Sequence, residues 1–189
     1  FGDIDVMWFD FSYPDRDYKG MSGKGCDDWQ SEKLMNMVRE LQPGVIVNNR
    51  LDLPAEVIDI HTPEQYQPRE WPHIDGKPVV WETCQTLSGS WGYHRDEATW
   101  KSPEQLIKML INTVSTGGNL LMNVGPTARG NLDQRALDAL EVYAQWMKLH
   151  KRSIYGCSQS EFTSPPGCRF TQNGNRLYLH VFDWPYKHI

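Results

Sequence analysis

The stretch Ile4-Asp5-Val6-Met7-Trp8-Phe9-Asp10 decides the fold class. Five of the six residues from Ile4 to Phe9 are apolar or aromatic, which is typical of a strand buried on both faces of a parallel sheet. The run ends at the carboxylate of Asp10, and Pro14 cannot continue a central strand. In a barrel of parallel strands the catalytic groups lie where strands end and loops begin, so Asp10 is a catalytic candidate. The plain alternative is a carboxylate that caps a turn.

Helices are predicted where apolar residues recur at the spacing of one helical face behind a capping residue. The predicted ranges are 27–42, 102–115 and 131–152. The first range starts with Asp27 and Gln30 as a capping box, and the second with Ser102, Pro103 and Gln105. The expected buried face of the first helix comprises Leu34, Met37, Val38 and Leu41. That of the last helix comprises Leu137, Leu140, Ala144 and Met147.

Further strands are predicted over 45–49, 79–84 and 119–124, each a short run bounded by Pro or Gly. The stretch 51–78 contains five prolines and shows no helical period. A structureless loop of this length in a compact domain is usually functional. Near the end of the chain, Asn173-Gly174 lies between two predicted strands and predicts a hairpin with a type I′ turn.

This order of elements is typical of an α/β fold with a parallel sheet. Four strands cannot close a barrel, and a complete (β/α)₈ barrel takes about 250 residues. The sequence therefore predicts half of a TIM-like barrel over 1–156, followed by a second, β-rich domain that starts over 157–189. The chain begins at Phe1 without Met, close to a strand, so we expect an internal fragment or a truncated product.

Composition excludes some function classes. The net charge of −5, without a basic stripe, argues against a nucleic-acid partner, and no apolar run is long enough to span a membrane. The four cysteines show no zinc-ligand spacing, and their pairing is open among three disulfide arrangements and free thiols. Eight tryptophans are enough for both a core and an aromatic cleft that stacks on flat apolar ligand faces, sugars included.

Loops that leave the strand ends bring Asp10, Arg50, Glu64 and Trp91 to one rim. Two carboxylates at such a rim suggest glycoside hydrolysis, in which one acts at the anomeric carbon and the other handles the proton. Arg50 is suited to hold a neighbouring carboxylate or sugar hydroxyls. No metal or cofactor is needed, because the carboxylates supply both the nucleophile and the proton. Ordinary surface ion pairs are the competing interpretation.

Six motifs occur in one order and carry a resemblance to a known family. They are Asp5-Val6-Met7-Trp8-Phe9-Asp10, Val47-Asn48-Asn49-Arg50, Thr62-Pro63-Glu64-Gln65, Trp81-Glu82-Thr83-Cys84, Ser90-Trp91-Gly92-Tyr93 and the stretch 117–126, Gly-Gly-Asn-Leu-Leu-Met-Asn-Val-Gly-Pro. Together they resemble the second half of the catalytic domain of family 29 glycoside hydrolases, the retaining α-L-fucosidases. The resemblance covers 1–156, and the following hairpin is similar to the start of that family's C-terminal β-sandwich.

The resemblance implies a role for each matching residue. Asp10 matches the family's nucleophile, and Glu64 matches its general acid/base, whose position varies between subgroups. Trp8 matches an aromatic that lines the fucose pocket, and Arg50 a sugar-contacting arginine. Trp91 matches an aromatic that packs on the apolar C6 methyl side of fucose. The family's pocket also takes several His residues, a Trp and a Tyr from the earlier half of the barrel, which this sequence does not contain.

Other assignments stay open. Glu82, at the end of the predicted strand over 79–84, is the second candidate for the proton donor. His61 and His94 could contact substrate, although surface or supporting histidines are the simpler interpretation.

The resemblance also implies a substrate, a fucosylated oligosaccharide or glycoconjugate, and a secreted, periplasmic or lysosomal location. The alternatives are a non-catalytic half-barrel that binds fucose or persists as a remnant, and a retaining glycosidase for a related sugar such as α-galactose. Unpaired sheet edges and an uncovered apolar face predict that the chain alone aggregates or forms an oligomer. The preferred linkage, the aglycone, the oligomeric state and the compartment stay open.

Overall fold

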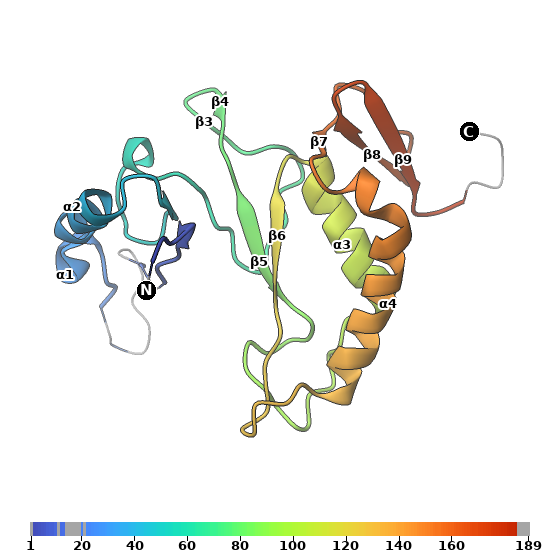
Figure 1. Cartoon of the computed structure of the whole chain (residues 1–189), viewed down its shortest axis with the longest axis horizontal. Coiled ribbons are helices and arrows are strands. Elements are labelled where there is room, and N and C mark those ends of the chain that lie inside the picture. The colour runs from blue at the N-terminus through green and yellow to red at the C-terminus, as the bar shows by residue number, and fades with distance from the viewer. Residues whose placement is uncertain (1, 11, 14–19, 21, 185–189) are drawn as a thin grey trace. The chain divides into compact units, whose positions relative to one another are not determined.

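The computed structural model describes residues 2–10, 12–13, 20 and 22–184 (Figure 1). Pro14, which we expected to end the first strand, lies outside these residues. The chain divides into two compact units. The first unit is Phe1–Thr62 with His73–Trp81, and the second is Pro63–Pro72 with Glu82–Ile189. This division differs from the boundary after residue 156, which stays a prediction.

The first unit is built on parallel strand pairing. Strand β1 (Val6–Met7) pairs in parallel with β2 (Ile46–Val47). Two parallel bridges continue the pattern, from Asn48 to Ile60 and from His61 to Trp81. The core of this unit consists of Met35, Val45, Val47 and Leu51, with partly buried Met7, Phe9, Leu34, Val38, Leu53 and Ile58 around it. The predicted parallel orientation of the strands is therefore confirmed for this part of the chain.

The first strand is shorter and more exposed than predicted. The pairing covers two residues instead of six, and 38% of Ile4, 43% of Val6 and 42% of Ile46 is exposed. Within the described residues, β2 is the strand that pairs with β1, and the core takes Met7 and Phe9 from one side. The expectation of burial on both faces was therefore wrong: Ile4 and Val6 are exposed, and the three residues from Met7 to Phe9 are half-buried.

The first predicted helix is split in two. Helix α1 (Cys26–Trp29) and helix α2 (Ser31–Leu41) are separated at Gln30, whose φ of 50° is left-handed. The Asp28 carboxylate accepts a hydrogen bond from the Gly25 N–H at 2.9 Å, so the N-cap is Gly25, two residues before the predicted cap at Asp27.

The buried face of α2 also differs from the prediction. It comprises Ser31 and Met35, with partly buried Leu34 and Val38. Met37 is 47% exposed and Leu41 is 73% exposed. Those two assignments were wrong. The i, i+3, i+4 and i+7 pattern is present, but it starts at Ser31 rather than Leu34.

The stretch 51–78 contains more structure than predicted. A short 3₁₀ turn covers Ala55–Val57, and strands β3 (His73–Ile74) and β4 (Lys77–Pro78) form an antiparallel hairpin. The hairpin turns at Asp75 and Gly76, with φ of 51° and 74°. Positive φ at both central residues is the mark of a type I′ turn, which Asp-Gly favours. The Asp-Gly pair was thus a turn signal that the sequence analysis missed.

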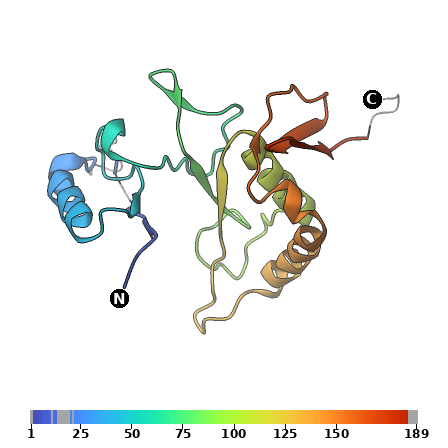
Figure 2. The same cartoon turned by 45° about the horizontal axis from the view of Figure 1, so that its top comes forward.

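In the second unit, strand β5 (Glu82–Thr86) pairs in parallel with β6 (Asn119–Asn123), from Glu82 opposite Asn119 to Thr86 opposite Asn123. Helices α3 (Pro103–Ser115) and α4 (Gln134–His150) lie side by side next to this pair (Figure 2). Helix α3 starts as predicted, since Ser102 and Gln105 hydrogen-bond each other's backbone N–H groups. It ends before Gly117, which has a φ of 80° and lies so close to the Trp71 ring that a Cβ would clash.

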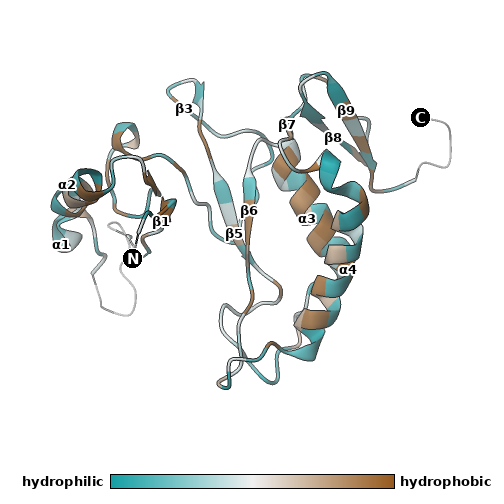
Figure 3. Ribbon diagram, viewed as in Figure 1, coloured by the Kyte–Doolittle hydropathy of each residue, from teal (hydrophilic) through white to brown (hydrophobic). Residues whose placement is uncertain are grey.

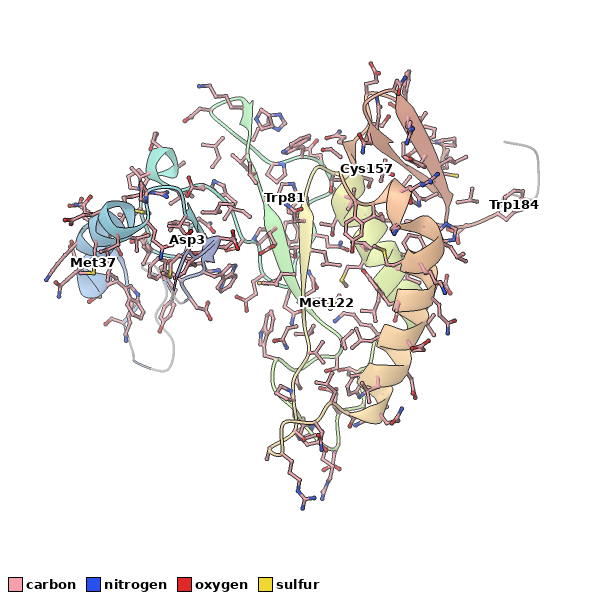
Figure 4. All side chains as sticks on the ribbon, in the orientation of Figure 1. Asp3, Met37, Trp81, Met122, Cys157 and Trp184 are labelled. Carbon is pink, nitrogen blue, oxygen red and sulfur yellow. The ribbon has the colours of Figure 1, made fainter. Side chains whose placement is uncertain are left out.

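Two apolar clusters form the core of the second unit, and α3 contributes to both (Figure 3). One contains Leu87, Leu106, Ala136 and Ala139, and the other contains Leu110, Ile111, Val114 and Ile154. Met122 of β6 packs on the first cluster (Figure 4). On α4, Leu137 is 43% exposed and Ala144 is exposed, so these two members of the predicted face were wrong. Ala136 and Ala139 are buried in their place, because close contact with α3 favours small side chains.

The chain continues into a three-stranded antiparallel sheet of β7 (Ser158–Gln159), β8 (Cys168–Asn173) and β9 (Arg176–Val181), after a 3₁₀ turn at Lys151–Ser153. The predicted hairpin is present. Asn173 pairs with Arg176, so the turn residues are Gly174 and Asn175. Only Gly174 of these two has a positive φ, of 57°, which matches a type II′ turn rather than the predicted type I′.

Three further observations concern the sequence predictions. All four cysteines are free thiols. No helix in the described part of the chain is long and apolar enough to cross a membrane. Among the described residues, no three His, Cys, Asp or Glu side chains gather as metal ligands would.

Candidate active site

Asp10 follows β1, and the backbone of the residue before it, Phe9, is held by the buried Asn48 directly after β2. The Asn48 side chain donates to the Phe9 carbonyl at 2.8 Å and accepts from the Phe9 N–H at 3.0 Å. Asn48 is fully buried. Both hydrogen bonds act on the residue before Asp10, so they fix where the carboxylate leaves the strand end. Sequence reasoning assigned no role to Asn48.

Arg50 follows β2 and holds the Asp10 carboxylate from a protected position. Its Nη1 lies 3.0 Å from Asp10 Oδ1. Its Nε donates to Thr62 Oγ1 and its Nη2 to the Thr62 carbonyl, both at 3.0 Å. The Arg50 side chain is 14% exposed, whereas that of Asp10 is 50% exposed. The arrangement is a fixed cation that orients a carboxylate open to solvent.

A second asparagine fixes the residue that anchors Arg50. Asn49 Oδ1 accepts from both the backbone N–H and the hydroxyl of Thr62, each at 2.9 Å. With its hydrogen committed to Asn49, the Thr62 hydroxyl presents a lone pair to Arg50 Nε. Asn49 and Thr62 were also missed. The signal was available, because two adjacent amides within an apolar run need hydrogen-bond partners once buried.

Trp8 completes this group. The Arg50 guanidinium carbon lies 4.7 Å from the centre of the Trp8 ring, a cation–π distance. The indole N–H is buried and has no hydrogen-bond partner among the described residues. The contact that Trp8 makes with Arg50 is therefore through the face of its ring. The structure brings the predicted residues Trp8, Asp10 and Arg50 together.

The two candidates for the proton donor, Glu64 and Glu82, lie in the second unit. Glu64 is exposed and forms a parallel bridge to Cys84. The next residue, Gln65, has a φ of 54° and donates through its side chain to Thr86 Oγ1 at 3.2 Å. A left-handed residue beside Glu64 turns the chain sharply there. Glu82 is the first residue of β5 and is half-buried.

Trp91 also lies in the second unit, on the loop 87–101 that joins β5 to α3. Its side chain is 40% exposed. A pocket of about 20 Å³, room for about one water molecule, is lined by its sequence neighbours Ser90 and Gly92 but not by Trp91 itself. Its lining includes Ser90, His94, Glu97 and Asn123. Glu64 and Trp91 thus belong to one unit, and the Asp10 group belongs to the other.

The two histidines differ in burial. His61 is half-buried in the bridge to Trp81, and burial lowers its pKa, so it is neutral near pH 7. His94 is exposed beside the pocket. A substrate role for either histidine stays a prediction.

Glu97 ties the Trp91 loop together. Its carboxylate accepts from Ser90 Oγ at 2.5 Å, from the Thr99 N–H at 2.8 Å and from Thr99 Oγ1 at 2.6 Å. The hydrogen bond from the Ser90 hydroxyl, followed by those from Thr99, lowers the pKa of Glu97 from 4.5 to about 2. The loop is therefore closed by an ionised carboxylate at neutral pH.

We expect the Glu97→Gln variant to lose part of the acid sensitivity of the fold. The folded-state pKa lies below the unfolded value, so ionised Glu97 stabilises the loop above pH 4.5, and this contribution is lost as the pH falls toward about 2. Urea unfolding at several pH values across this window measures how steeply the free energy of unfolding changes with pH. The variant should show the shallower dependence, and Glu40→Gln, at an exposed position of α2, should keep the parent slope. Equal slopes in all three proteins would contradict this role of Glu97.

Comparison with known proteins identifies the family. A sequence model described as Alpha-L-fucosidase matches residues 1–152 of this chain. The human plasma α-L-fucosidase is 34% identical over 116 residues, which cover 57% of this chain and 25% of the relative. The chain therefore spans about a quarter of the length of such curated relatives.

Solved structures agree over nearly the whole chain. The α-L-fucosidase isoenzyme 1 from Paenibacillus thiaminolyticus is 42% identical with a TM-score of 0.85, over 98% of this chain and 44% of that one. An α-L-fucosidase of Bacteroides thetaiotaomicron, trapped as a covalent intermediate with 2-fluoro-fucosyl fluoride in a Glu→Gln mutant, is 25% identical with a TM-score of 0.79, over 97% of this chain and 44% of that one. This chain belongs to the α-L-fucosidase family.

Proposed function

We propose that this chain carries the nucleophile and the acid/base of a retaining α-L-fucosidase that hydrolyses terminal α-L-fucosyl linkages. The observation that carries the proposal is the Asp10 carboxylate, half-exposed at a strand end and held by the mostly covered side chain of Arg50. Family membership supports it. The chain would be the second half of a (β/α)₈ catalytic barrel over 1–156, followed by the start of a β-sandwich over 157–189. The related solved fucosidases combine these two architectures.

The first chemical step would form a covalent fucosyl-enzyme. A carboxylate oxygen of Asp10 attacks the anomeric carbon, the bond from that carbon to the glycosidic oxygen breaks, and Glu64 gives its proton to the departing oxygen. Arg50 holds the carboxylate and Asn48 holds the Phe9 backbone before it, so little reorganisation is needed at the moment of attack. The trapped intermediate of the Bacteroides relative supports a covalent route.

The second step would release fucose. Glu64, now ionised, takes a proton from water, the water oxygen bonds to the anomeric carbon, and the ester bond to Asp10 breaks. Two displacements at the same carbon retain its configuration. The free enzyme is restored with Asp10 ionised and Glu64 protonated. No cofactor enters this scheme.

The proposed substrate is a fucosylated oligosaccharide or glycoconjugate. Fucose differs from other galacto-configured sugars by an apolar methyl group at C6, and an exposed indole such as that of Trp91 is suited to pack on it. The ring of Trp8 would line the same sugar site beside Arg50. A secreted, periplasmic or lysosomal location is part of the proposal, and the plasma enzyme among the relatives supports the secreted case.

The Arg50→Lys variant tests the proposal at the residue that organises the site. In the full-length protein, we expect kcat/KM for 4-nitrophenyl α-L-fucoside to fall by about 10- to 100-fold. A lysine keeps the charge but cannot contact Asp10, both Thr62 oxygens and the Trp8 ring at once. Steady-state kinetics measures the loss, and thermal melting tests for loss of the fold.

Arg39→Lys is the matched control. Arg39 is also in the first unit and also pairs with an aspartate, Asp59, but it lies on α2. We expect this variant to change stability and to keep kcat/KM within about twofold. Equal kcat/KM values for the parent and Arg50→Lys would contradict the proposed role of Arg50 and weaken the assignment of the site.

A further inference from the structure

The stretch 117–126, one of the six motifs that resemble the family, has no role in the chemistry proposed above. It forms β6 and the turn that leaves it. At the end of β6, Asn123 Nδ2 lies 2.6 Å from the Trp91 carbonyl oxygen. A carbonyl oxygen can only accept, so the amide nitrogen of Asn123 must face it. This hydrogen bond links two segments that are 32 residues apart in sequence.

Gly125 makes a second contact with the same loop. A Cβ at Gly125 would lie 2.7 Å from the Gly92 carbonyl carbon and 2.8 Å from the Tyr93 nitrogen. These are backbone atoms, which cannot rotate away as a side-chain end could. Glycine is therefore required here for space, because the strand exit rests directly on the two residues after Trp91.

The rest of the loop is held independently. Glu97 ties Ser90 to Thr99. From the start of α4, Arg135 donates to the Glu97 carbonyl at 2.9 Å and to the Arg95 carbonyl at 3.2 Å. The Arg135 guanidinium carbon also lies 4.7 Å from the centre of the Trp100 ring. The flanks of the loop are thus fixed without β6, which leaves Asn123 and Gly125 to fix its tip.

We propose that Asn123 and Gly125 are positioning residues that set the place of the Trp91 indole and thereby the preference for an apolar C6. The indole is 40% exposed, so core packing does not lock it, and its position follows that of its backbone. The backbone at Trp91 and Gly92 is fixed by Asn123 and Gly125. This inference rests on the proposed function, in which Trp91 packs on the C6 methyl group.

The Asn123→Asp variant of the full-length protein is the test. The substitution keeps the size of the side chain but replaces the amide nitrogen with a carboxylate oxygen. This oxygen is an acceptor and cannot donate a hydrogen bond to the Trp91 carbonyl. The readout is the ratio of kcat/KM for 4-nitrophenyl α-L-fucoside to that for 4-nitrophenyl α-L-galactoside, which carries a hydroxyl on C6. We expect the ratio to fall by about threefold to tenfold, mainly through a higher KM for the fucoside. Asn119→Asp, at the exposed opposite end of β6, should keep the parent ratio.

A double mutant separates positioning from general destabilisation. In Trp91→Ala the ratio should fall as well, and adding Asn123→Asp should lower it no further, because both changes remove the same contact. Gly125→Ala should behave as Asn123→Asp does. A parent without fucosidase activity, or a Trp91→Ala variant with the parent ratio, would overturn the proposed role of Trp91 and this inference with it. A reduced ratio in Trp91→Ala beside unchanged ratios in Asn123→Asp and Gly125→Ala would overturn this inference alone.

Discussion

Replacing Asp10 with Gly is expected to lower fucoside hydrolysis by the full-length protein by about 10³-fold or more. The variant has no group that can attack the anomeric carbon from the side opposite the leaving group. Arg50, held by Thr62, stays in place, so the loss should be in kcat rather than in folding. Steady-state kinetics with 4-nitrophenyl α-L-fucoside measures it. Asp5→Ala, at an exposed position of the same strand segment, is the matched control and should keep the parent rate.

Azide gives this variant a distinctive product. In the space left by the carboxylate, azide can attack the anomeric carbon while the bond to the leaving group breaks. A single displacement inverts the configuration, so the product should be β-L-fucosyl azide. NMR of the product determines the configuration. Activity of Asp10→Gly within tenfold of the parent would remove Asp10 from the mechanism.

The second large effect concerns the proton donor. If Glu64 is the acid/base, kcat/KM of the Glu64→Ala variant should fall by about 10²- to 10⁴-fold for substrates whose leaving group needs a proton. A dinitrophenyl fucoside hardly needs one, so its fucosyl-transfer step to Asp10 should be largely spared. Release of fucose then becomes slow, because no base activates water. Burst kinetics with the two substrates separates the steps.

Azide again identifies the step. In Glu64→Ala it would replace water in the second displacement, and two displacements give α-L-fucosyl azide, the opposite configuration to that from Asp10→Gly. Glu82→Ala is the control, since Glu82 is half-buried at the start of β5 and is the second candidate. If Glu82→Ala gives the leaving-group dependence and the α-azide while Glu64→Ala loses activity uniformly, the assignment of Glu64 is wrong.

Local signals in the sequence predicted the elements that depend on local chemistry. Helix α3 starts at Pro103 as expected, because the Ser102 and Gln105 caps act within four residues. Strand β6 matches its predicted range to within one residue. The hairpin of β8 and β9 was also predicted, although its turn uses Gly174 and Asn175.

Features that depend on packing were harder to predict. The predicted face of the first helix is right at Leu34 and Val38, but the structure buries Ser31 and Met35 in place of Met37 and Leu41. Hydrophobic spacing marks a helix without saying which of two overlapping faces a neighbour covers.

For the candidate site, the residues at the strand ends were predictable, but the residues that hydrogen-bond and hold them were not. Asp10 and Arg50 come together because they follow two neighbouring parallel strands, which the sequence indicated. Asn48 and Asn49 hold the pair through hydrogen bonds to Phe9 and Thr62, and long-range partners of this kind leave no periodic pattern. Glu64 and Trp91, which the loops after the predicted strands were also expected to bring to this rim, lie in the second unit, and their place in the site stays a prediction.

Covalent labelling tests the central claim, that Asp10 is the nucleophile, most directly. The full-length protein would be incubated with 2-fluoro-fucosyl fluoride, the reagent that trapped the Bacteroides relative, digested with a protease, and analysed by tandem mass spectrometry. The account predicts one added 2-fluoro-fucosyl group, on Asp10, and none in the Asp10→Gly variant. Labelling of Glu64, Glu82 or another carboxylate in its place, or an unlabelled but active enzyme, would contradict it.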